Sequence, residues 1–66
     1  MIESIGLAAG DIFEILKREG EMPLKKLQEK TQLPTKLFYM ALGWLSREDK
    51  IIYRHKRNRL EVKIRE

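Results

Sequence analysis

The stretch TKLFYMALGWLSRE, residues 35–48, decides the fold. It combines nine residues without a charge, Leu37 to Leu45, with a helical spacing of its apolar side chains. At 100° per residue, four of these side chains fall within one arc, which is the pattern of a helix with one buried face. The sequence therefore predicts a helix from about Thr35 to Glu48. Its buried face is predicted to consist of Phe38, Ala41, Leu42 and Leu45.

The same helix carries more apolar surface than one buried face requires. Leu37 and Trp44 fall together on one flank, and Met40 falls on the side opposite the core. One interpretation is that Trp44 covers the core where a following hairpin docks. The alternative is an exposed apolar patch, which is typical of a protein interface. This alternative predicts an interface, in a homodimer or with another protein, made by Leu37, Met40 and Trp44.

A first helix is predicted near the start of the chain. Apolar residues recur at helical spacing from Ile5 to Leu16, and Gly20 suits the cap position after the last turn. Gly6 and Gly10 lie inside this helix, where they would permit a close backbone approach by a neighbour.

A second, shorter helix follows an extended segment. Pro23 disfavours a helical conformation at the residue before it, so residues 21–23 are a candidate short strand. The helix is then expected from Leu24 to Thr31. Pro34 suits the first positions of the next helix, with Thr35 as a candidate cap.

The last third of the chain has the pattern of a β-hairpin. The segments IIYRH (51–55) and RLEVKIR (59–65) are rich in β-branched residues, and the second alternates between apolar and polar side chains. The intervening turn is polar, and Asn58 suits a left-handed backbone there. Because a lone hairpin is marginally stable, it must dock on the helices. The docking face is predicted to consist of Leu60, Val62 and Ile64.

Positive charge is concentrated in the second half of the chain. Residues 35–66 hold nine of the 14 Lys and Arg residues but four of the ten Asp and Glu residues. This half therefore carries a net charge of +5, whereas residues 1–34 carry −1. Such asymmetry favours a polyanionic partner, and a merely solvated surface is the plainer alternative.

Several kinds of chemistry lack the residues they need. Cysteine is absent, so neither a disulfide nor a thiolate site is expected. The single histidine, His55, has no other type of metal ligand clustered with it, and there is no glycine-rich phosphate loop. We therefore expect no enzyme, no metal or cofactor and no small-molecule substrate. Because there is neither a basic signal-peptide region nor an apolar run of about 18 residues, we expect a cytoplasmic protein without membrane contact.

Two segments carry a resemblance to a known family. MALGWLSREDKI (40–51) and IGLAAGDIF (5–13) resemble a small family of bacterial and archaeal winged helix-turn-helix proteins whose function is uncharacterised. The resemblance extends over nearly the whole chain. It implies a single α+β domain over residues 1–66, with three helices followed by a two-stranded hairpin, the wing. Nucleic-acid binding is implied by analogy, since a fold does not by itself define a function.

Two turn positions depart from the general winged-helix pattern. The turn before the third helix often carries a glycine, and here the residue is Gln32. The turn after that helix commonly reads Glu-Gly, and here it reads Glu48-Asp49. These departures concern the local geometry of the turns rather than the fold, because left-handed backbone is energetically less favourable for these residues than for glycine.

On DNA, the third helix of such a domain enters the major groove, and a basic wing lies along phosphates or in the minor groove. The centre of this helix's exposed side, at Met40 and Gly43, has no group that reads a base edge, so modest sequence specificity is expected. Simple solvated charges, which also protect sheet edges, are the alternative. The predicted nucleic-acid contacts are Thr35, Lys36, Tyr39 and Arg47 on the helix and Arg54, Lys56, Arg57 and Arg59 on the wing.

Two functions from different classes follow from these patterns. The first is a small transcriptional regulator or chromatin-associated factor that binds double-stranded DNA through the third helix and the wing. This function requires Phe38 and Leu45 to be buried and Arg57 to lie on the same side of the molecule as Lys36. The alternative is a protein-interaction or dimerisation module that reuses the fold.

Overall fold

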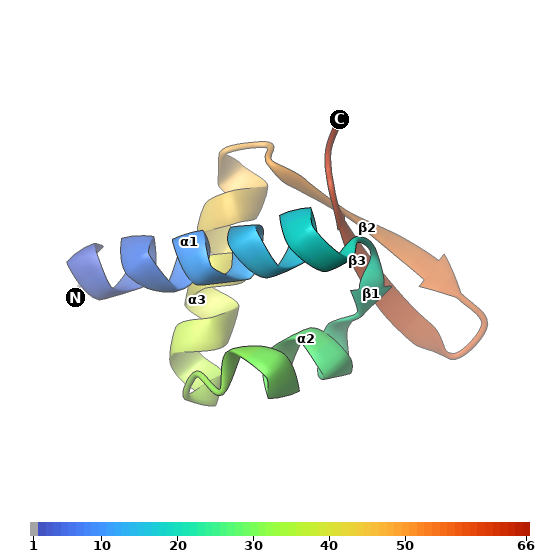
Figure 1. The fold of residues 1–66 in the computed structure, drawn as a ribbon, viewed down its shortest axis with the longest axis horizontal. Helices are drawn as coiled ribbons and strands as arrows, with labels where there is room; N and C mark the ends of the chain where they lie inside the picture. The colour runs from blue at the N-terminus through green and yellow to red at the C-terminus, as the bar shows by residue number, and fades with distance from the viewer. Residues whose placement is uncertain (1) are drawn as a thin grey trace.

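The computed structural model describes residues 2–66, with side chains from residue 4 onward, as three helices and a small sheet. The helix α1 lies across α3, and the hairpin of β2 and β3 extends to the side away from the N-terminal end of α1 (Figure 1). The expected order of elements, including a short strand near residues 21–23, is confirmed. The elements are α1 (Ile2–Glu19), β1 (Met22–Pro23), α2 (Leu24–Thr31), α3 (Thr35–Arg47), β2 (Ile51–Lys56) and β3 (Arg59–Ile64).

The core lies between α1 and α3, with α2 and the sheet closing its sides. The predicted buried face of α3 is confirmed: Phe38 is fully buried and Leu45 is 4% exposed. The helix ends at Arg47, one residue before the expected Glu48. On α1 the buried side chains are Ala8, Ala9, Ile12 and Leu16.

Gly20 ends α1 as predicted. Its φ angle is 86°, in the left-handed region that glycine adopts without a Cβ clash, and its N–H donates to the carbonyl of Leu16 at 2.8 Å.

The turn between α2 and α3 depends on a side-chain contact that the sequence did not suggest. Thr35 was expected to cap α3, and that prediction is wrong, because the cap residue is Pro34 and no side chain bonds the first turn. The Thr35 hydroxyl instead accepts a hydrogen bond from the Gln28 amide at 3.2 Å. This bond joins α2 to the beginning of α3.

The two departures from the winged-helix turn pattern both fall on left-handed backbone. Gln32 has a φ angle of 56°, and Asp49 has a φ angle of 60°. A non-glycine residue in this region costs roughly 1–2 kcal/mol relative to right-handed backbone. Asp49 is held in addition by Arg65, whose Nη1 lies 2.6 Å from Oδ1. The fold therefore keeps the turns that glycine usually makes, at a cost in stability.

The sheet has the strand order β1-β3-β2, and both pairs are antiparallel. Its core face is anchored by Met22, Ile51 and Val62, all 5% exposed or less. The hairpin turn consists of two residues, 57 and 58. The left-handed residue there is Arg57, with a φ angle of 56°, so the assignment of that conformation to Asn58 is wrong.

The flank of α3 that carries Trp44 faces α1 rather than the hairpin. Trp44 is 40% exposed and lines a hollow with Gly6, Gly10 and Phe13 of α1. The interpretation that it covers the core beneath the hairpin is therefore wrong. A Cβ at either glycine would meet nothing within 4 Å, so the predicted close backbone approach does not occur among the residues that the structure describes.

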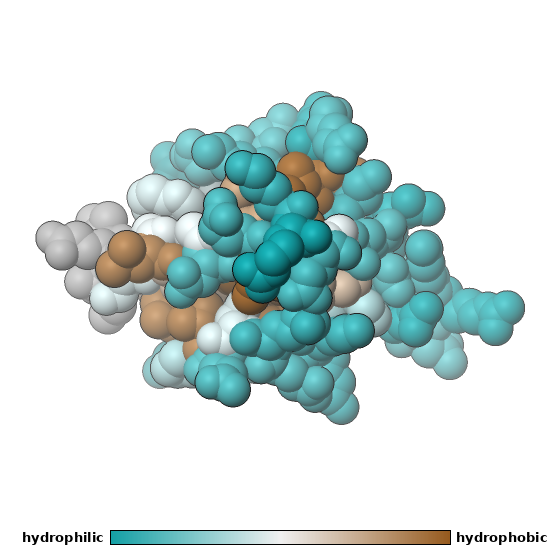
Figure 2. Space-filling view, in the orientation of Figure 1, coloured by the Kyte–Doolittle hydropathy of each residue, from teal (hydrophilic) through white to brown (hydrophobic). Residues whose placement is uncertain are grey.

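The surface differs between the two ends of the molecule. Apolar side chains gather toward the N-terminal half of α1, whereas the hairpin end is covered by hydrophilic residues (Figure 2). Leu7, at 74%, has the largest exposed fraction among the exposed apolar residues. Among residues 2–66, no helix has both the length and the apolar character that a bilayer crossing requires.

Candidate nucleic-acid interface

The side of α3 opposite the core is open to solvent, as predicted. Lys36, Met40, Gly43 and Arg47 are all exposed along it. A Cβ at Gly43 would meet no atom within 4 Å, so no other part of the described chain packs on the helix at that position. Tyr39, 49% exposed, stands beside it with its ring edge-on to the buried Phe38 at 5.2 Å. The helix therefore presents a continuous free surface of the length a groove would contact.

The wing is tied to α3 by a hydrogen bond between side chains. The hydroxyls of Ser46 on α3 and Tyr53 on β2 lie 2.8 Å apart. Because side chains alternate along a strand, Tyr53 and His55 share the face of β2 that carries the buried Ile51. Sequence reasoning missed Tyr53, although the same alternation, applied to residues 51–56, indicates it.

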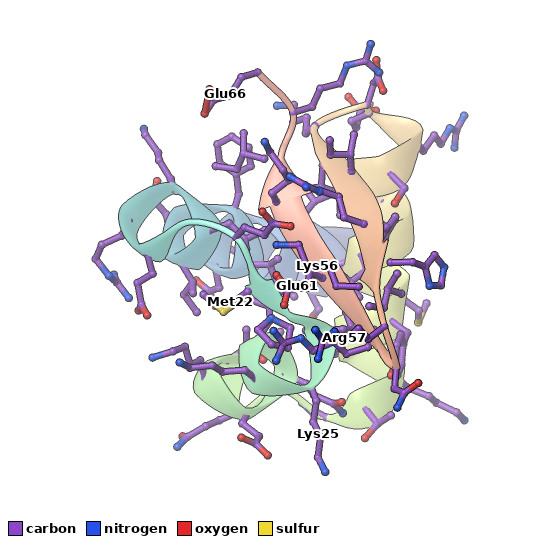
Figure 3. All side chains as sticks on the ribbon, turned by 90° about the vertical axis from the view of Figure 1, so that its right-hand side faces the viewer. Met22, Lys25, Lys56, Arg57, Glu61 and Glu66 are labelled. Carbon is purple, nitrogen blue, oxygen red and sulfur yellow. The ribbon has the colours of Figure 1, made fainter. Side chains whose placement is uncertain are left out.

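A groove brings α2, α3 and the wing turn together. Its lining includes Tyr39 of α3 and Asn58 of the wing turn. The view from the wing end shows Arg57 above Lys25, which projects from α2 (Figure 3). The structure thus places the hairpin tip next to one flank of α3. The groove lining is completed by Pro23, Leu24, Lys25, Gln28, Arg59 and Leu60.

Three of the four wing residues that are predicted to contact nucleic acid have carboxylate neighbours on the outer face of the sheet. Arg54 Nη1 lies 3.5 Å from Glu21 Oε1, and Lys56 Nζ lies 3.9 Å from Glu21 Oε2. Glu61 is 3.7 Å from Lys56 Nζ through Oε1 and 3.0 Å from Arg59 Nε through Oε2. The run of basic residues, which no acid interrupts in the sequence, is therefore partly neutralised by acids from β3 and from the loop before β1.

The remaining predicted cations have no such partner. Among the residues that the structure describes, no ion pair involves Lys36, Arg47 or Arg57, and the same holds for Lys25. The structure therefore divides the predicted basic contacts into a group without ion pairs and a group with them. The two uncharged predicted contacts, Thr35 and Tyr39, also lie on the exposed surface of α3.

Elsewhere, one ion pair joins α2 to α1, and a second lies within α1. Lys30 Nζ lies 3.0 Å from Glu19 Oε1, and Arg18 lies 3.3 Å from Oε2. The hydrogen bond from Lys30, followed by that from Arg18, lowers the pKa of Glu19 below its ordinary value. Within residues 2–66, no group of three or more His, Cys, Asp or Glu side chains is arranged to hold a metal ion.

The chain belongs to the winged helix-turn-helix domain family DUF2582, whose model matches residues 1–64. Its structure is similar to the solution structure of protein BT2368 from Bacteroides thetaiotaomicron, with a TM-score of 0.81 and 26% sequence identity. The similarity covers 94% of this chain and 76% of that protein. A comparison with curated proteins finds no significant match. The predicted fold class and the family resemblance are thereby confirmed.

Proposed function

We propose that the chain binds double-stranded DNA, as a small transcriptional regulator or chromatin-associated factor, with α3 in the major groove and the wing turn on the adjacent backbone. The observation that supports this most is the groove that Tyr39 and the wing turn both line, because one duplex can contact both of them. The winged helix-turn-helix family to which the chain belongs favours DNA binding in general.

In this proposal four of the cations without an ion pair make the phosphate contacts. Lys36 and Arg47 stand at the two ends of α3, Arg57 at the wing turn and Lys25 in the first turn of α2. Each cation that neutralises a phosphate releases counterions, which supplies affinity without sequence information. The hydroxyls of Thr35 and Tyr39 add hydrogen bonds, and the Gln28 amide fixes the position of the first.

Sequence discrimination by α3 is modest in this proposal. Met40 and Gly43 occupy the middle of the exposed surface and offer no donor or acceptor to a base edge. Met40 can contact a thymine methyl group, and Arg47 or Lys36 can reach a guanine edge. We therefore infer that backbone contacts dominate the binding.

The experiment is a fluorescence-anisotropy titration of a labelled duplex between about 50 and 200 mM salt. We expect binding that weakens steeply with salt, and Lys36→Ala should lower both the affinity and the magnitude of the salt slope. Lys17→Ala is the matched control, because it removes the same charge from the exposed side of α1. Absence of binding to any duplex at low salt would exclude the proposed function.

A second candidate function is self-association through the flank of α3. Met40 and Trp44 are 44% and 40% exposed. Large apolar side chains that are exposed next to one another are typical of a protein interface. Leu37 is half-buried against the core, so it contributes less than the sequence suggested. Sedimentation across a dilution series tests this candidate. A dimer that Trp44→Lys dissociates supports this candidate, and a monomer at every concentration excludes it.

A further inference from the structure

We propose that Glu21 and Glu61 form a carboxylate latch that holds Arg54, Lys56 and Arg59 on the outer face of the sheet. The latch withholds these three cations from polyanions, so that the wing meets DNA mainly through Arg57. This inference rests on the proposed function, which it deepens by dividing the wing into an available and an unavailable part.

The latch is centred on a nearly buried carboxylate. Glu61 is 6% exposed. It lies on the central strand β3, between Pro23 on β1 and Arg54 on β2 in the strand register. Removing the counter-charges from a buried carboxylate is unfavourable, because it leaves a buried charge uncompensated. A phosphate that draws Arg59 or Lys56 away must therefore compensate for the free energy of leaving Glu61 buried without that counter-charge.

The register of the hairpin explains why an anion is needed there. Lys56 and Arg59 are direct cross-strand partners, and like charges in that arrangement destabilise a sheet. Glu61 contacts both, at 3.7 Å and 3.0 Å, and so offsets their repulsion. Figure 3 shows Lys56 and Glu61 together on the sheet, with Arg57 separate from them nearer the hairpin tip.

Glu21 extends the latch from the loop before β1. Its two oxygens face Arg54 and Lys56, so Lys56 is shared between both carboxylates. The oxygen nearest Lys56, Oε2, is buried and has no hydrogen-bond partner among the described residues. This oxygen therefore depends on the charge of Lys56, which adds to the cost of moving that side chain to a phosphate.

The latch predicts a specific effect of removing one carboxylate. Glu61→Gln keeps the size of the side chain but frees Arg59 and loosens Lys56. We expect the variant to bind a duplex more tightly, with a salt slope steeper by about one to two units, since each added phosphate contact contributes about 0.9. Glu14→Gln is the matched control, because it makes the same change in net charge at an exposed site on α1.

Elution from immobilised heparin at neutral pH tests the latch without DNA. We expect Glu61→Gln to elute at clearly higher salt than Glu14→Gln, which in turn differs little from the wild type. If the two variants elute together, the latch is refuted, whether or not the protein binds DNA. If neither the wild type nor Glu61→Gln binds any duplex but they separate on heparin, the proposed function fails and the latch stands.

A second variant guards against loss of folding at the buried position. Glu21 has a side chain that is 21% exposed, so Glu21→Gln disturbs the packing less than Glu61→Gln. It frees Arg54, and we expect a shift on heparin in the same direction and of smaller size. Circular dichroism of both variants checks that the fold is kept. Elution of Glu21→Gln with Glu14→Gln would overturn the role assigned to Glu21.

Discussion

The hydroxyls of Ser46 and Tyr53, 2.8 Å apart, join α3 to the wing. These residues come from different elements on either side of the turn after α3, so their hydrogen bond adds to the core packing that holds the hairpin against the helix. The wing and α3 are therefore presented as one surface and not as two independent parts. This relationship underlies the proposal that both contact the same duplex.

Removing this hydrogen bond should weaken the domain slightly. We expect Tyr53→Phe to lower the free energy of unfolding by about 0.5–1.5 kcal/mol, the usual net contribution of one hydrogen bond. For a domain of this size, about 1 kcal/mol corresponds to a Tm decrease of roughly 4–8 °C. Ser46→Ala should have a similar effect, and the double variant should be less destabilised than the sum of the two. Strict additivity would show that the bond does not form in solution.

The left-handed residue Gln32 offers a route to higher stability. Its φ angle of 56° suits glycine, so Gln32→Gly should raise the free energy of unfolding by about 0.5–1 kcal/mol. Gln32→Ala is the control, because it removes the side chain but keeps the strain. Urea denaturation of the three proteins measures the difference. A glycine variant no more stable than the alanine variant would contradict the described turn. Asp49→Gly should gain less, because it also removes the ion pair with Arg65.

Acid should weaken the contact between α1 and α2. Lys30 and Arg18 lower the pKa of Glu19 below 4.5, so the folded state binds a proton at Glu19 less readily than the unfolded state. The stabilisation is therefore present above about pH 4.5 and is lost as the pH falls through the lowered pKa. Thermal unfolding from pH 6 down to about pH 3 should show a smaller decrease in Tm for Glu19→Gln than for the wild type. Parallel curves would contradict the pairing.

Arg57 is the wing residue whose loss should matter most for binding. Glycine suits its φ angle of 56°, so Arg57→Gly removes the charge without straining the turn. We expect weaker duplex binding, and a salt slope smaller in magnitude by about one unit, the value for one lost phosphate contact. Arg54→Gln is the comparison, because Arg54 is paired with Glu21 and should change both quantities less. Equal effects of the two variants would contradict the division of the wing cations.

Most of the fold could be predicted because local pattern and global packing agree. The arc of Phe38 and Leu45 needs a partner helix, and the only other long apolar stripe in the sequence is that of α1. Pro23 lies directly before the first residue of α2, and Pro34 lies directly before the first residue of α3. The hairpin follows from alternation in residues 59–65, and its docking follows from the apolar face that Val62 centres.

The candidate site could be predicted only in part, because ion pairing across strands is not visible along the chain. Residues 54–59 contain no acid, yet Glu61 and Glu21 reach three of their cations once the strands pair. The groove beside Tyr39 likewise depends on where the hairpin tip falls, which the length of β2 sets. A run of basic residues in the sequence therefore overestimates the positive charge that a hairpin presents when an acid lies on the central strand of its sheet.

The most direct measurement is a titration of the ¹⁵N-labelled protein with a short duplex, followed by amide chemical shifts. We expect the largest changes at Lys25, Thr35, Tyr39 and Arg57, together with the exposed positions of α3. The outward-facing residues of α1 should change little. Shifts confined to α1, or none at about 50 mM salt, would contradict DNA binding through α3 and the wing turn.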